Sequence, residues 1–266
     1  MMDTFAPKDN NLDHNAYHKA VRTYVEQPVS TEDDREFTKQ EVGNTIGSMN
    51  NNKAPGTDGV TGNIYKQVFN TVPTFVTALY NGCLKQGIFP TIWKEAKIIP
   101  CVKPGQEKST EVTKYRPISL LIYGGKVLEK LLINRINHHP TYTGYLNKNQ
   151  YGFRPQTSSI DAVLALQEYE DGFRTGEVII LVSLDVEAAF NVAWWPAILK
   201  SLNDSRCPRN LYNLTSSYFS NRRATLQTSN NKIEAIITRG LPQGSCCGPG
   251  MWNIYYNSLL NLNFTH

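Results

Sequence analysis

Apolar positions along this chain recur with the spacings that distinguish helices from strands. Val42, Ile46 and Met49 repeat at helical spacing just after Thr38, and Glu41 stands where a helix-capping box requires an acid. A helix therefore begins at Thr38. Apolar periodicity and turn residues predict further helical segments over about 63–86, from about 125, after 158, within WWPAILKSL, over about 209–219 and after residue 248.

Three other segments predict extended backbone. Residues 96–99 form a short apolar run before a Pro-containing turn, and residues 223–240 have the pattern of a hairpin that turns near residue 230. Residues 178–184 are almost continuously apolar and lead directly to Asp185, which predicts a buried strand that ends in a carboxylate. Helices mixed with a small antiparallel sheet give an α+β fold.

The periodicity also predicts which side chains are buried. In the helical stretch at 63–86 we expect the core residues to be Ile64, Val68, Phe75, Leu79 and Leu84. In the helix that starts near residue 125 we expect them to be Val127, Leu128, Leu131 and Leu132. Residues 1–36 lack clear periodicity, and we assign them to an N-terminal extension before a main domain over 37–266.

Composition narrows the class of protein. Hydrophobic residues make up 40% and charged residues 19% of the chain, as in ordinary globular proteins. The five cysteines contain no C-x-x-C pair, so we expect reduced thiols in an intracellular protein. No apolar run approaches the roughly 20 residues that a membrane span needs, and the N-terminus is too polar for a signal peptide, so no membrane partner is expected.

Positive charge is concentrated in one part of the chain. Residues 94–135 contain nine Lys or Arg against four Glu, whereas the net charge of the whole chain is +4. Such a segment indicates either a polyanionic partner, phosphate or nucleic acid, or simply a solvated charged face.

Asp185 is the first candidate for chemistry. A carboxylate held at the end of a buried strand suits Mg²⁺, which takes oxygen ligands in near-octahedral geometry. The small residues Ala188 and Ala189 leave backbone N–H groups open to a phosphate, and Phe190 follows. The alternative is that Asp185 only caps the next turn.

Further candidates surround this segment in the sequence. Gln243 is a polar residue on a tight turn between Pro242 and Gly244, and Lys97, Lys103 and Arg116 come upstream. Each is a weak signal by itself, because turns and exposed lysines are common.

The order of these segments resembles the reverse transcriptases of non-LTR retrotransposons. The five similar boxes, which cover about residues 40–258, are NNKAPGTDGV, KYRPISLL, NQYGFRPQTSSIDAV, SLDVEAAF and GLPQGSCCGPG. The tryptophan pair in AFNVAWWPAIL and the form PQGSCCGP are similar to arthropod elements that insert into ribosomal RNA genes. The resemblance implies an RNA-directed DNA polymerase with fingers and a partial palm, a small antiparallel palm sheet packed on helices, and no thumb.

The resemblance also implies roles for residues of the SLDVEAAF box. Asp185 would bind two Mg²⁺ ions, with Mn²⁺ as a possible substitute, and the Val186 carbonyl would ligate one of them. Ala188 and Ala189 would present N–H groups to the triphosphate. Phe190 would lie under the sugar as a gate against a 2'-hydroxyl group.

Other boxes would complete the site and bind its partners, an RNA template, a DNA primer and deoxynucleoside triphosphates. Residues that would bind the nucleotide are Lys97, Lys103, Arg116, Gln243 and Gly244. Residues that would lie near the template are Gly152, Phe153 and Arg154. The oligomeric state is not indicated, and the place of action would be the nucleus.

Two departures from the family pattern affect the expected activity. Asn191 stands where the family usually has Asp, at a position that is not expected to touch metal. The family's A-D-D box, which supplies further metal carboxylates, has no counterpart after Gly244, and the last acidic residue is Glu234. We therefore expect a truncated fragment of a retrotransposon polyprotein that does not polymerise as given.

Two other readings of the sequence remain. One is a non-catalytic RNA-binding remnant that keeps the basic fingers. The other is an unrelated metal-dependent enzyme in which Asp185 converges with Asp58 or Asp161.

Overall fold

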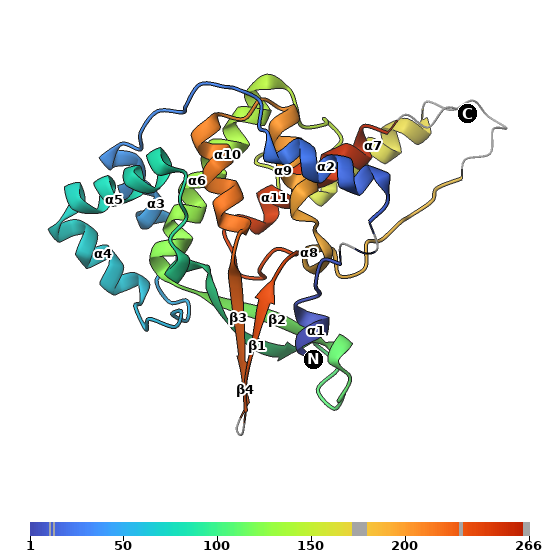
Figure 1. Ribbon diagram of the computed structural model, residues 1–266. Coiled ribbons are helices and arrows are strands. Elements are labelled where there is room, and N and C mark those ends of the chain that lie inside the picture. The colour runs from blue at the N-terminus through green and yellow to red at the C-terminus, as the bar shows by residue number, and fades with distance from the viewer. Residues whose placement is uncertain (11, 13, 172–179, 229–230, 263–266) are drawn as a thin grey trace.

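The computed structural model of the protein describes residues 1–10, 12, 14–171, 180–228 and 231–262. Its helices gather above one end of a four-stranded sheet, and the β3–β4 hairpin extends away from them (Figure 1). The elements are α1 Met2–Phe5, α2 Ala16–Glu26, α3 Lys39–Ser48, α4 Gly62–Thr71, α5 Pro73–Gln86, β1 Glu95–Val102, β2 Tyr115–Leu121, α6 Tyr123–Thr143, α7 Ser159–Asp171, α8 Ala189–Val192, α9 Trp195–Asp204, α10 Arg209–Phe219, β3 Arg222–Gln227, β4 Lys232–Ile237 and α11 Gly248–Leu260.

The sheet has the strand order β2-β1-β3-β4. β1 pairs antiparallel with β2, and β3 pairs antiparallel with β4 as the predicted hairpin. β1 and β3, however, run parallel, with Ala96 opposite Ala224. The α+β class is confirmed, but the purely antiparallel sheet is wrong, because the chain passes through the helical body after β2 and returns beside β1 in the same direction.

Helix α6 is central to the core. Its four predicted core residues, Val127, Leu128, Leu131 and Leu132, are all fully buried. They belong to one apolar cluster that also contains residues of α3, α5, α9, α10 and α11. Burial of each such side chain contributes roughly 1.5–3 kcal/mol. Around this core, α6 packs against α3, α4, α10 and α11.

Local capping signals predicted several helix ends correctly. The Thr38 side chain accepts a hydrogen bond from Glu41 N at 3.1 Å, and α3 begins at the next residue. The Glu41 carboxylate does not complete the capping box; it pairs with Arg135 of α6, whose guanidinium also reaches Asp34. This acid therefore joins α3 to α6.

The predicted burial of the helices at 63–86 is largely wrong. Leu84 is buried, but four other predicted core residues are exposed: Ile64, Val68, Phe75 and Leu79. α4 and α5 lie at the outer side of the body (Figure 1), and α5 turns Val76, Tyr80 and Leu84 inward. Periodicity identified the helices but chose the wrong face of them.

The N-terminal segment contains two helices that contact the rest of the protein. Phe5 of α1 packs in a second apolar cluster with residues of β1, β2 and β3. α2 lies against α9, and Val21 is buried there. Between the helices, Asp9 accepts a hydrogen bond from Trp194 Nε1 at 3.1 Å. The segment is thus part of the folded body.

All five cysteines are free thiols, as expected. In the part of the chain that the structure describes, no helix has both the length and the apolar character needed to cross a membrane.

The KAPGTDG segment provides a test of this packing. A Cβ atom added to Gly56 would lie 2.5 Å from Ile122 N, at the junction of β2 and α6. Because backbone atoms cannot yield as a side chain can, we expect Gly56→Ala to lower the free energy of unfolding by about 1–3 kcal/mol in a urea titration.

Gly82, in the interior of α5, is the matched control. A Cβ atom there meets nothing within 4 Å, so Gly82→Ala should raise the free energy of unfolding by about 0.5–1 kcal/mol. Equal stability of the two alanine variants would contradict the close approach at Gly56.

Candidate active site

The loop between β4 and α11, residues 238–247, connects three parts of the chain. Gly240 N donates to Ala193 O at 2.8 Å, and Leu241 N donates to Phe190 O at 2.7 Å. Further along the loop, Gln243 O accepts a hydrogen bond from Ser119 N of β2 at 2.7 Å. These backbone contacts bring the SLDVEAAF, RPIS and PQG segments together.

Two glycines make this close approach possible. Gly240 has φ +86° and Gly244 has φ +117°, a region that other residues rarely adopt. A Cβ atom would lie 2.6 Å from Asn191 O at the first position and 2.7 Å from Ser119 O at the second. The spacing R-G-L-P-Q-G therefore has a steric reason.

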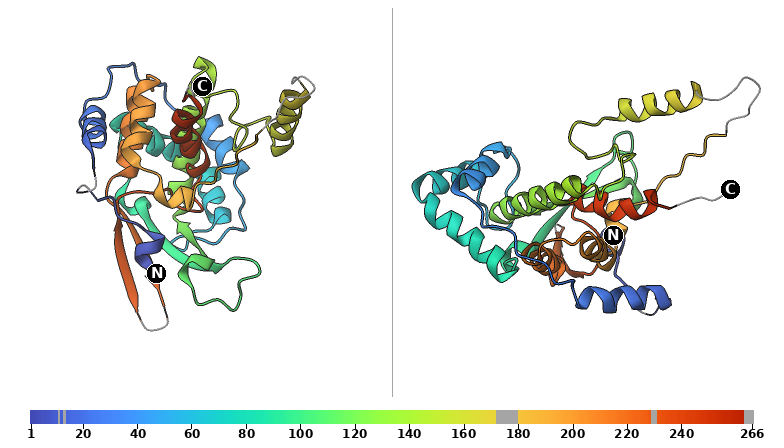
Figure 2. Two further views of the ribbon diagram at one scale, coloured as in Figure 1. Left: turned by 90° about the vertical axis from the view of Figure 1, so that its right-hand side faces the viewer. Right: turned by 90° about the horizontal axis from the view of Figure 1, so that it is seen from above.

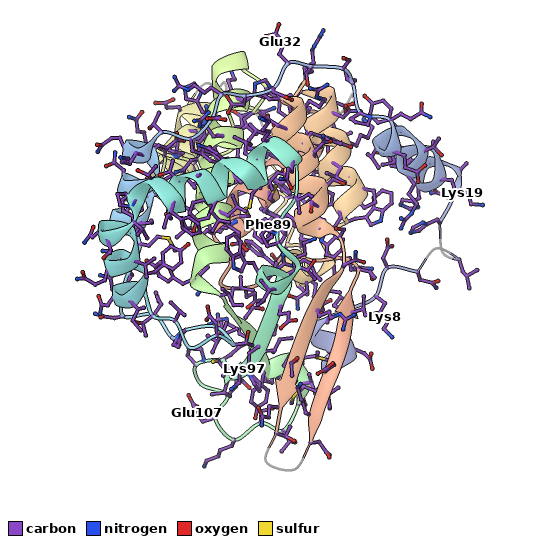
Figure 3. All side chains as sticks on the ribbon, turned by 60° about the vertical axis from the view of Figure 1, so that its left-hand side comes forward. Lys8, Lys19, Glu32, Phe89, Lys97 and Glu107 are labelled. Carbon is purple, nitrogen blue, oxygen red and sulfur yellow. The ribbon has the colours of Figure 1, made fainter. Side chains whose placement is uncertain are left out.

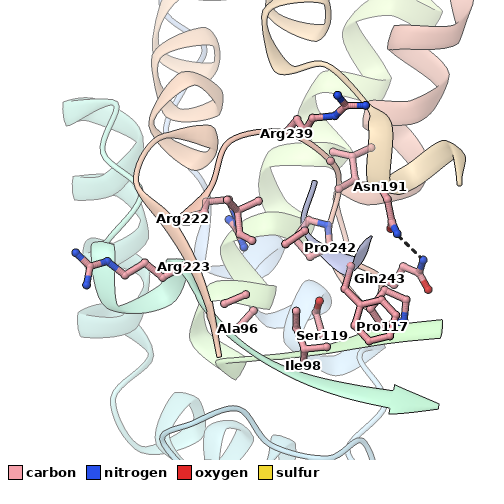
Figure 4. Close-up of a pocket in the computed structure, with 16 residues that line it drawn as sticks. Ala96, Ile98, Pro117, Ser119, Asn191, Arg222, Arg223, Arg239, Pro242 and Gln243 are labelled. Carbon is pink, nitrogen blue, oxygen red and sulfur yellow. Dashed lines mark hydrogen bonds between the residues drawn. The ribbon is translucent and has the colours of Figure 1, made fainter. Parts of the chain in front are cut away.

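Phe190 and Gln243, two predicted nucleotide-binding residues, lie at this junction. Gln243 Nε2 donates to Asn191 Oδ1 at 3.3 Å (Figure 4). The Phe190 ring stacks on Trp252 of α11, with centroids 5.8 Å apart, and meets the edge of Phe153 at 6.0 Å. The structure thus brings together the predicted gate, the predicted pocket residue and one predicted template residue.

The rest of the predicted template box is tied to α11. Asn253 Nδ2 donates to Gly152 O at 3.0 Å and to Phe153 O at 3.2 Å. Arg154 Nη1 donates to Asn147 O at 3.2 Å. Phe153 itself is exposed and has φ +54°, so its ring is presented at the surface next to Phe190.

The predicted buried strand before Asp185 is wrong in the part that can be compared. Residues 178–179 lie outside the described residues, and residues 180–186 form no strand. Ile180 is 82% and Leu184 88% exposed, and Asp185 is exposed as well. A strand needs a hydrogen-bonded neighbour, and no described strand pairs with this segment, which lies apart from the sheet (Figure 2).

Asp185 and Val186 lie in this exposed segment, next to Glu187. Among the described residues, no group of three or more His, Cys, Asp or Glu could hold a metal ion. The metal-binding roles of Asp185 and Val186 in the intact parent stay predictions. α8 begins at Ala189 without a side-chain cap, and Ala188 before it is left-handed, with φ +50°.

Asp58 and Asp161, the two acids of the alternative metal site, each accept hydrogen bonds from residues close to them in the sequence. Asp161 Oδ2 accepts hydrogen bonds from the backbone N–H of Ser158 at 2.6 Å and from its hydroxyl at 2.7 Å. Asp58 Oδ1 accepts a hydrogen bond from Val60 N at 3.2 Å. Each carboxylate serves the turn or helix start in which it lies.

The three predicted phosphate-binding cations lie on and beside β1 and β2. Lys97 lies on β1 (Figure 3) and is half-buried, whereas Arg116 on β2 is exposed. Lys103 N donates to Lys114 O at 2.9 Å just beyond the paired strands. Among the described residues none of these three side chains pairs with an acid, so their charge is available to an anion.

A small cavity of about 40 Å³ lies between the sheet and the loop. It is lined by residues that include Ala96, Ser119, Arg222 and Gln243. Figure 4 shows the guanidinium groups of Arg223 and Arg239 turned away from it. The cavity is too small for a nucleotide.

Sequence reasoning missed a buried carboxylate behind the loop. Glu129 of α6 is fully buried, and its Oε2 accepts hydrogen bonds from Ser245 Oγ and Cys246 N, both at 2.7 Å. Its signal is visible in retrospect: Gly125, Leu132 and Ile136, at helical spacing from Glu129, are small or apolar. An acid on such a stripe is a candidate for a buried group.

Arg222 is a buried cation whose charge acts on the Glu129 carboxyl group. It is 1% exposed, its guanidinium lies 4.4 Å from the Tyr218 ring centroid, and Nη1 donates to Tyr218 O at 3.2 Å. Burial raises the pKa of Glu129, and the charge of Arg222 and the hydrogen bonds oppose that rise.

The raised pKa of Glu129 gives a testable pH dependence. A carboxyl group whose folded pKa lies above its ordinary value of 4.5 binds its proton more tightly in the folded state. Its contribution to stability is therefore complete below pH 4.5 and is lost as the pH rises through the folded pKa. We expect the difference in free energy of unfolding, wild type minus Glu129→Gln, to fall as the pH is raised from about 4, measured by urea titration.

A difference that rises over this range would contradict the direction of the shift. Glu107→Gln is the control, because Glu107 is exposed and its pKa is lowered by backbone hydrogen bonds. The corresponding difference for that variant should not fall with pH.

Comparison with known proteins agrees with the ordered boxes. Residues 103–265 match the family model of reverse transcriptase (RNA-dependent DNA polymerase). The chain is 32% identical over 221 residues to a putative 115 kDa protein in the type-1 retrotransposable element R1DM of Drosophila melanogaster, a match over 83% of this chain and 21% of that protein.

Other relatives are similar to the same degree. A retrovirus-related Pol polyprotein from the type-1 retrotransposable element R1 of Bradysia coprophila is 30% identical over 83% of this chain and 22% of its own length. The RNA-directed DNA polymerase from mobile element jockey of Drosophila melanogaster is 30% identical over 84% of this chain and 24% of its own length. The chain thus spans only about a fifth to a quarter of these relatives. It belongs to the reverse transcriptase family and, as its five boxes predicted, to the reverse transcriptases of non-LTR retrotransposons.

Proposed function

We propose that residues 37–266 act as the fingers and palm portion of a reverse transcriptase, binding an RNA template, a DNA primer and the incoming deoxynucleoside triphosphate. The observation that carries the proposal is the junction at the β4–α11 loop, where the Phe190 ring meets Phe153 and the next residue, Asn191, is bonded to Gln243. Three segments far apart in sequence lie together there. The place of action of the parent protein would be the nucleus.

Phe190 is the proposed gate for the sugar. Its ring stacks on Trp252 and makes a T-shaped contact with Phe153. A rigid aromatic ring under the sugar would leave no room for a 2'-hydroxyl group. Ala188 and Ala189, just before it, would offer backbone N–H groups to the triphosphate.

Positively charged side chains on and beside β1 and β2, the strands that we assign to the fingers, would bind the phosphates. Lys97, Lys103 and Arg116 carry no acid partner among the described residues. Gln243 and Gly244 would line the nucleotide on the palm side, where the left-handed backbone of Gly244 permits close approach. Gly152, Phe153 and Arg154 would lie beside the template strand.

Members of this family use divalent metal ions, and we propose Mg²⁺ or Mn²⁺ as the ion and Asp185 with the Val186 carbonyl as ligands. Two ions about 3.5–4 Å apart require several carboxylates to share their charge. In the described part of the chain this box supplies Asp185 and Glu187, both exposed, and neither belongs to a group of three or more potential ligands. These residues do not fit a two-metal site, and we derive no chemical step through metal.

A non-catalytic RNA-binding role is the second candidate. The observation that favours it is the exposed, unpaired backbone around Asp185, which contrasts with the well-packed fingers strands. Both roles require RNA binding. Only the polymerase role requires a deoxynucleoside triphosphate to bind at Phe190 and Gln243, so nucleotide affinity separates the two.

Salt dependence tests the nucleic-acid interface. Because phosphate contacts release counterions, the logarithm of the affinity for a primed RNA duplex should fall linearly with the logarithm of the salt concentration. Alanine at Lys97, Lys103 or Arg116 should each reduce that slope by about one, measured by fluorescence anisotropy.

Lys19 provides the control, because it lies on α2, away from the sheet that carries Lys97 (Figure 3). Lys19→Ala should leave the slope unchanged. Affinity that is insensitive to salt in the wild-type protein would rule out a basic groove.

Selectivity for the sugar tests the gate. Phe190→Ala removes the ring that would contact C2', so the ratio of deoxynucleotide to ribonucleotide affinity in the presence of primed RNA should fall by about tenfold or more. Phe219→Leu, at a buried ring stacked on Trp195, should lower stability without changing this ratio. An unchanged ratio in Phe190→Ala would remove the gate role.

A further inference from the structure

Glu129 binds three consecutive residues that follow the Gln243–Gly244 turn. Its carboxylate oxygen Oε2 accepts hydrogen bonds from Ser245 Oγ and Cys246 N, and its backbone carbonyl accepts one from Cys247 Sγ at 3.3 Å. Both the side chain and the backbone of one residue of α6 therefore hold the end of the loop.

These contacts lie where α11 begins. The first N–H groups of a helix have no partner inside it, and the helix end carries partial positive charge. Cys246 N, which donates to the Glu129 carboxylate, lies one residue before Cys247, the N-cap of the thirteen-residue helix α11. The buried acid therefore holds the end of the loop beside the positive end of this helix.

Ser245 extends this contact to α10. Its hydroxyl lies 3.0 Å from Tyr218 OH and accepts a hydrogen bond from Cys247 N at 3.0 Å. Because that hydroxyl already donates to Glu129, its orientation is determined. Ser245 N in turn donates to Pro242 O at 3.0 Å, which closes the turn around Gln243 and Gly244.

Burying the Glu129 side chain in this position costs free energy. A buried carboxylate loses its hydration and is stabilised only where hydrogen bonds and an opposite charge compensate. An apolar residue at this position of α6 would avoid that cost, as Leu128 and Leu132 beside it do. What an apolar residue cannot do is accept hydrogen bonds from residues 245 and 246.

The Gln243–Gly244 turn is thus held from two sides. β2 holds it through Ser119 N and Gln243 O, and α6 holds it through Glu129. We propose that Glu129 is a positioning residue of the nucleotide pocket, which sets the orientation of Gln243 and Gly244 by the reach of its carboxylate oxygen. The pocket role rests on the proposed function; the holding of the loop does not.

Two conservative variants distinguish the effect of the length of the side chain at residue 129 from the effect of its charge. Glu129→Gln keeps an acceptor oxygen at the same distance from the backbone and removes the charge. Glu129→Asp keeps the charge and shortens the side chain by one methylene group. If the hydrogen bonds position the loop, Gln should preserve it and Asp should not.

The first measurement is amide hydrogen exchange at residues 245–247 in the free protein. We expect these amides to exchange at least about tenfold faster in Glu129→Asp than in the wild type, because hydrogen bonds to a charged group are lost. In Glu129→Gln their exchange rates should stay within about threefold of the wild-type rates. Ile136→Val removes one methylene group from a buried side chain on the same helix and is the control for general destabilisation. It should leave the exchange rates of these amides unchanged.

The second measurement is deoxynucleotide affinity in the presence of primed RNA. It should weaken about tenfold in Glu129→Asp, stay near the wild-type value in Glu129→Gln, and leave RNA affinity unchanged in both. Wild-type exchange and nucleotide affinity in Glu129→Asp would overturn the proposal, and so would equal losses in Asp and Gln.

A wild-type protein that binds no deoxynucleotide would overturn the proposed function and the pocket role together. The exchange data would still decide whether Glu129 holds the loop. The two failures are therefore distinguishable.

Discussion

The hydrogen bond from Ser119 N to Gln243 O is the contact on which the arrangement of the site depends. β2 is an edge strand, and an edge strand presents unpaired backbone groups. Here one of them binds the β4–α11 loop through a single parallel bridge between Ile118 and Gln243. Only glycine at 244 allows this approach, because a Cβ atom would meet Ser119 O at 2.7 Å.

Other segments singled out in the sequence lie near the same elements. The APG loop packs on the end of β2, where Gly56 meets Ile122. The QYGFR segment is bonded to α11 through Asn253. The first segment therefore lies at the end of the strand that binds the loop, and the second is bonded to the helix that begins where the loop ends.

Local signals explain what could be predicted from the sequence. The α10 helix runs over Arg209–Phe219 as expected, and the apolar residues of α6 are buried as expected, because periodicity and turn residues are properties of neighbours in the chain. The SLDVEAAF and PQG boxes identified Phe190 and Gln243, which the structure does bring together. Their roles stay predictions.

The failures share one physical origin, which is dependence on distant partners. Ile64 and Phe75 look like core residues, yet their helices are covered on the other side. Residues 180–186 look like a strand, yet no described strand pairs with them. The parallel pairing of β1 with β3 joins residues more than a hundred positions apart, and no local pattern contains that information. Glu129 was read as one more charge in a basic segment because burial, too, is set by the whole fold.

Hydrogen exchange on nucleotide binding tests the central claim most directly: the β4–α11 loop gathers these segments into one nucleotide site. The protein with primed RNA would be compared before and after addition of the complementary deoxynucleoside triphosphate. We expect amides of residues 188–191 and 240–247 to gain protection together, and a non-complementary nucleotide to have little effect. Protection of neither segment, or of only one of them, would contradict a shared site.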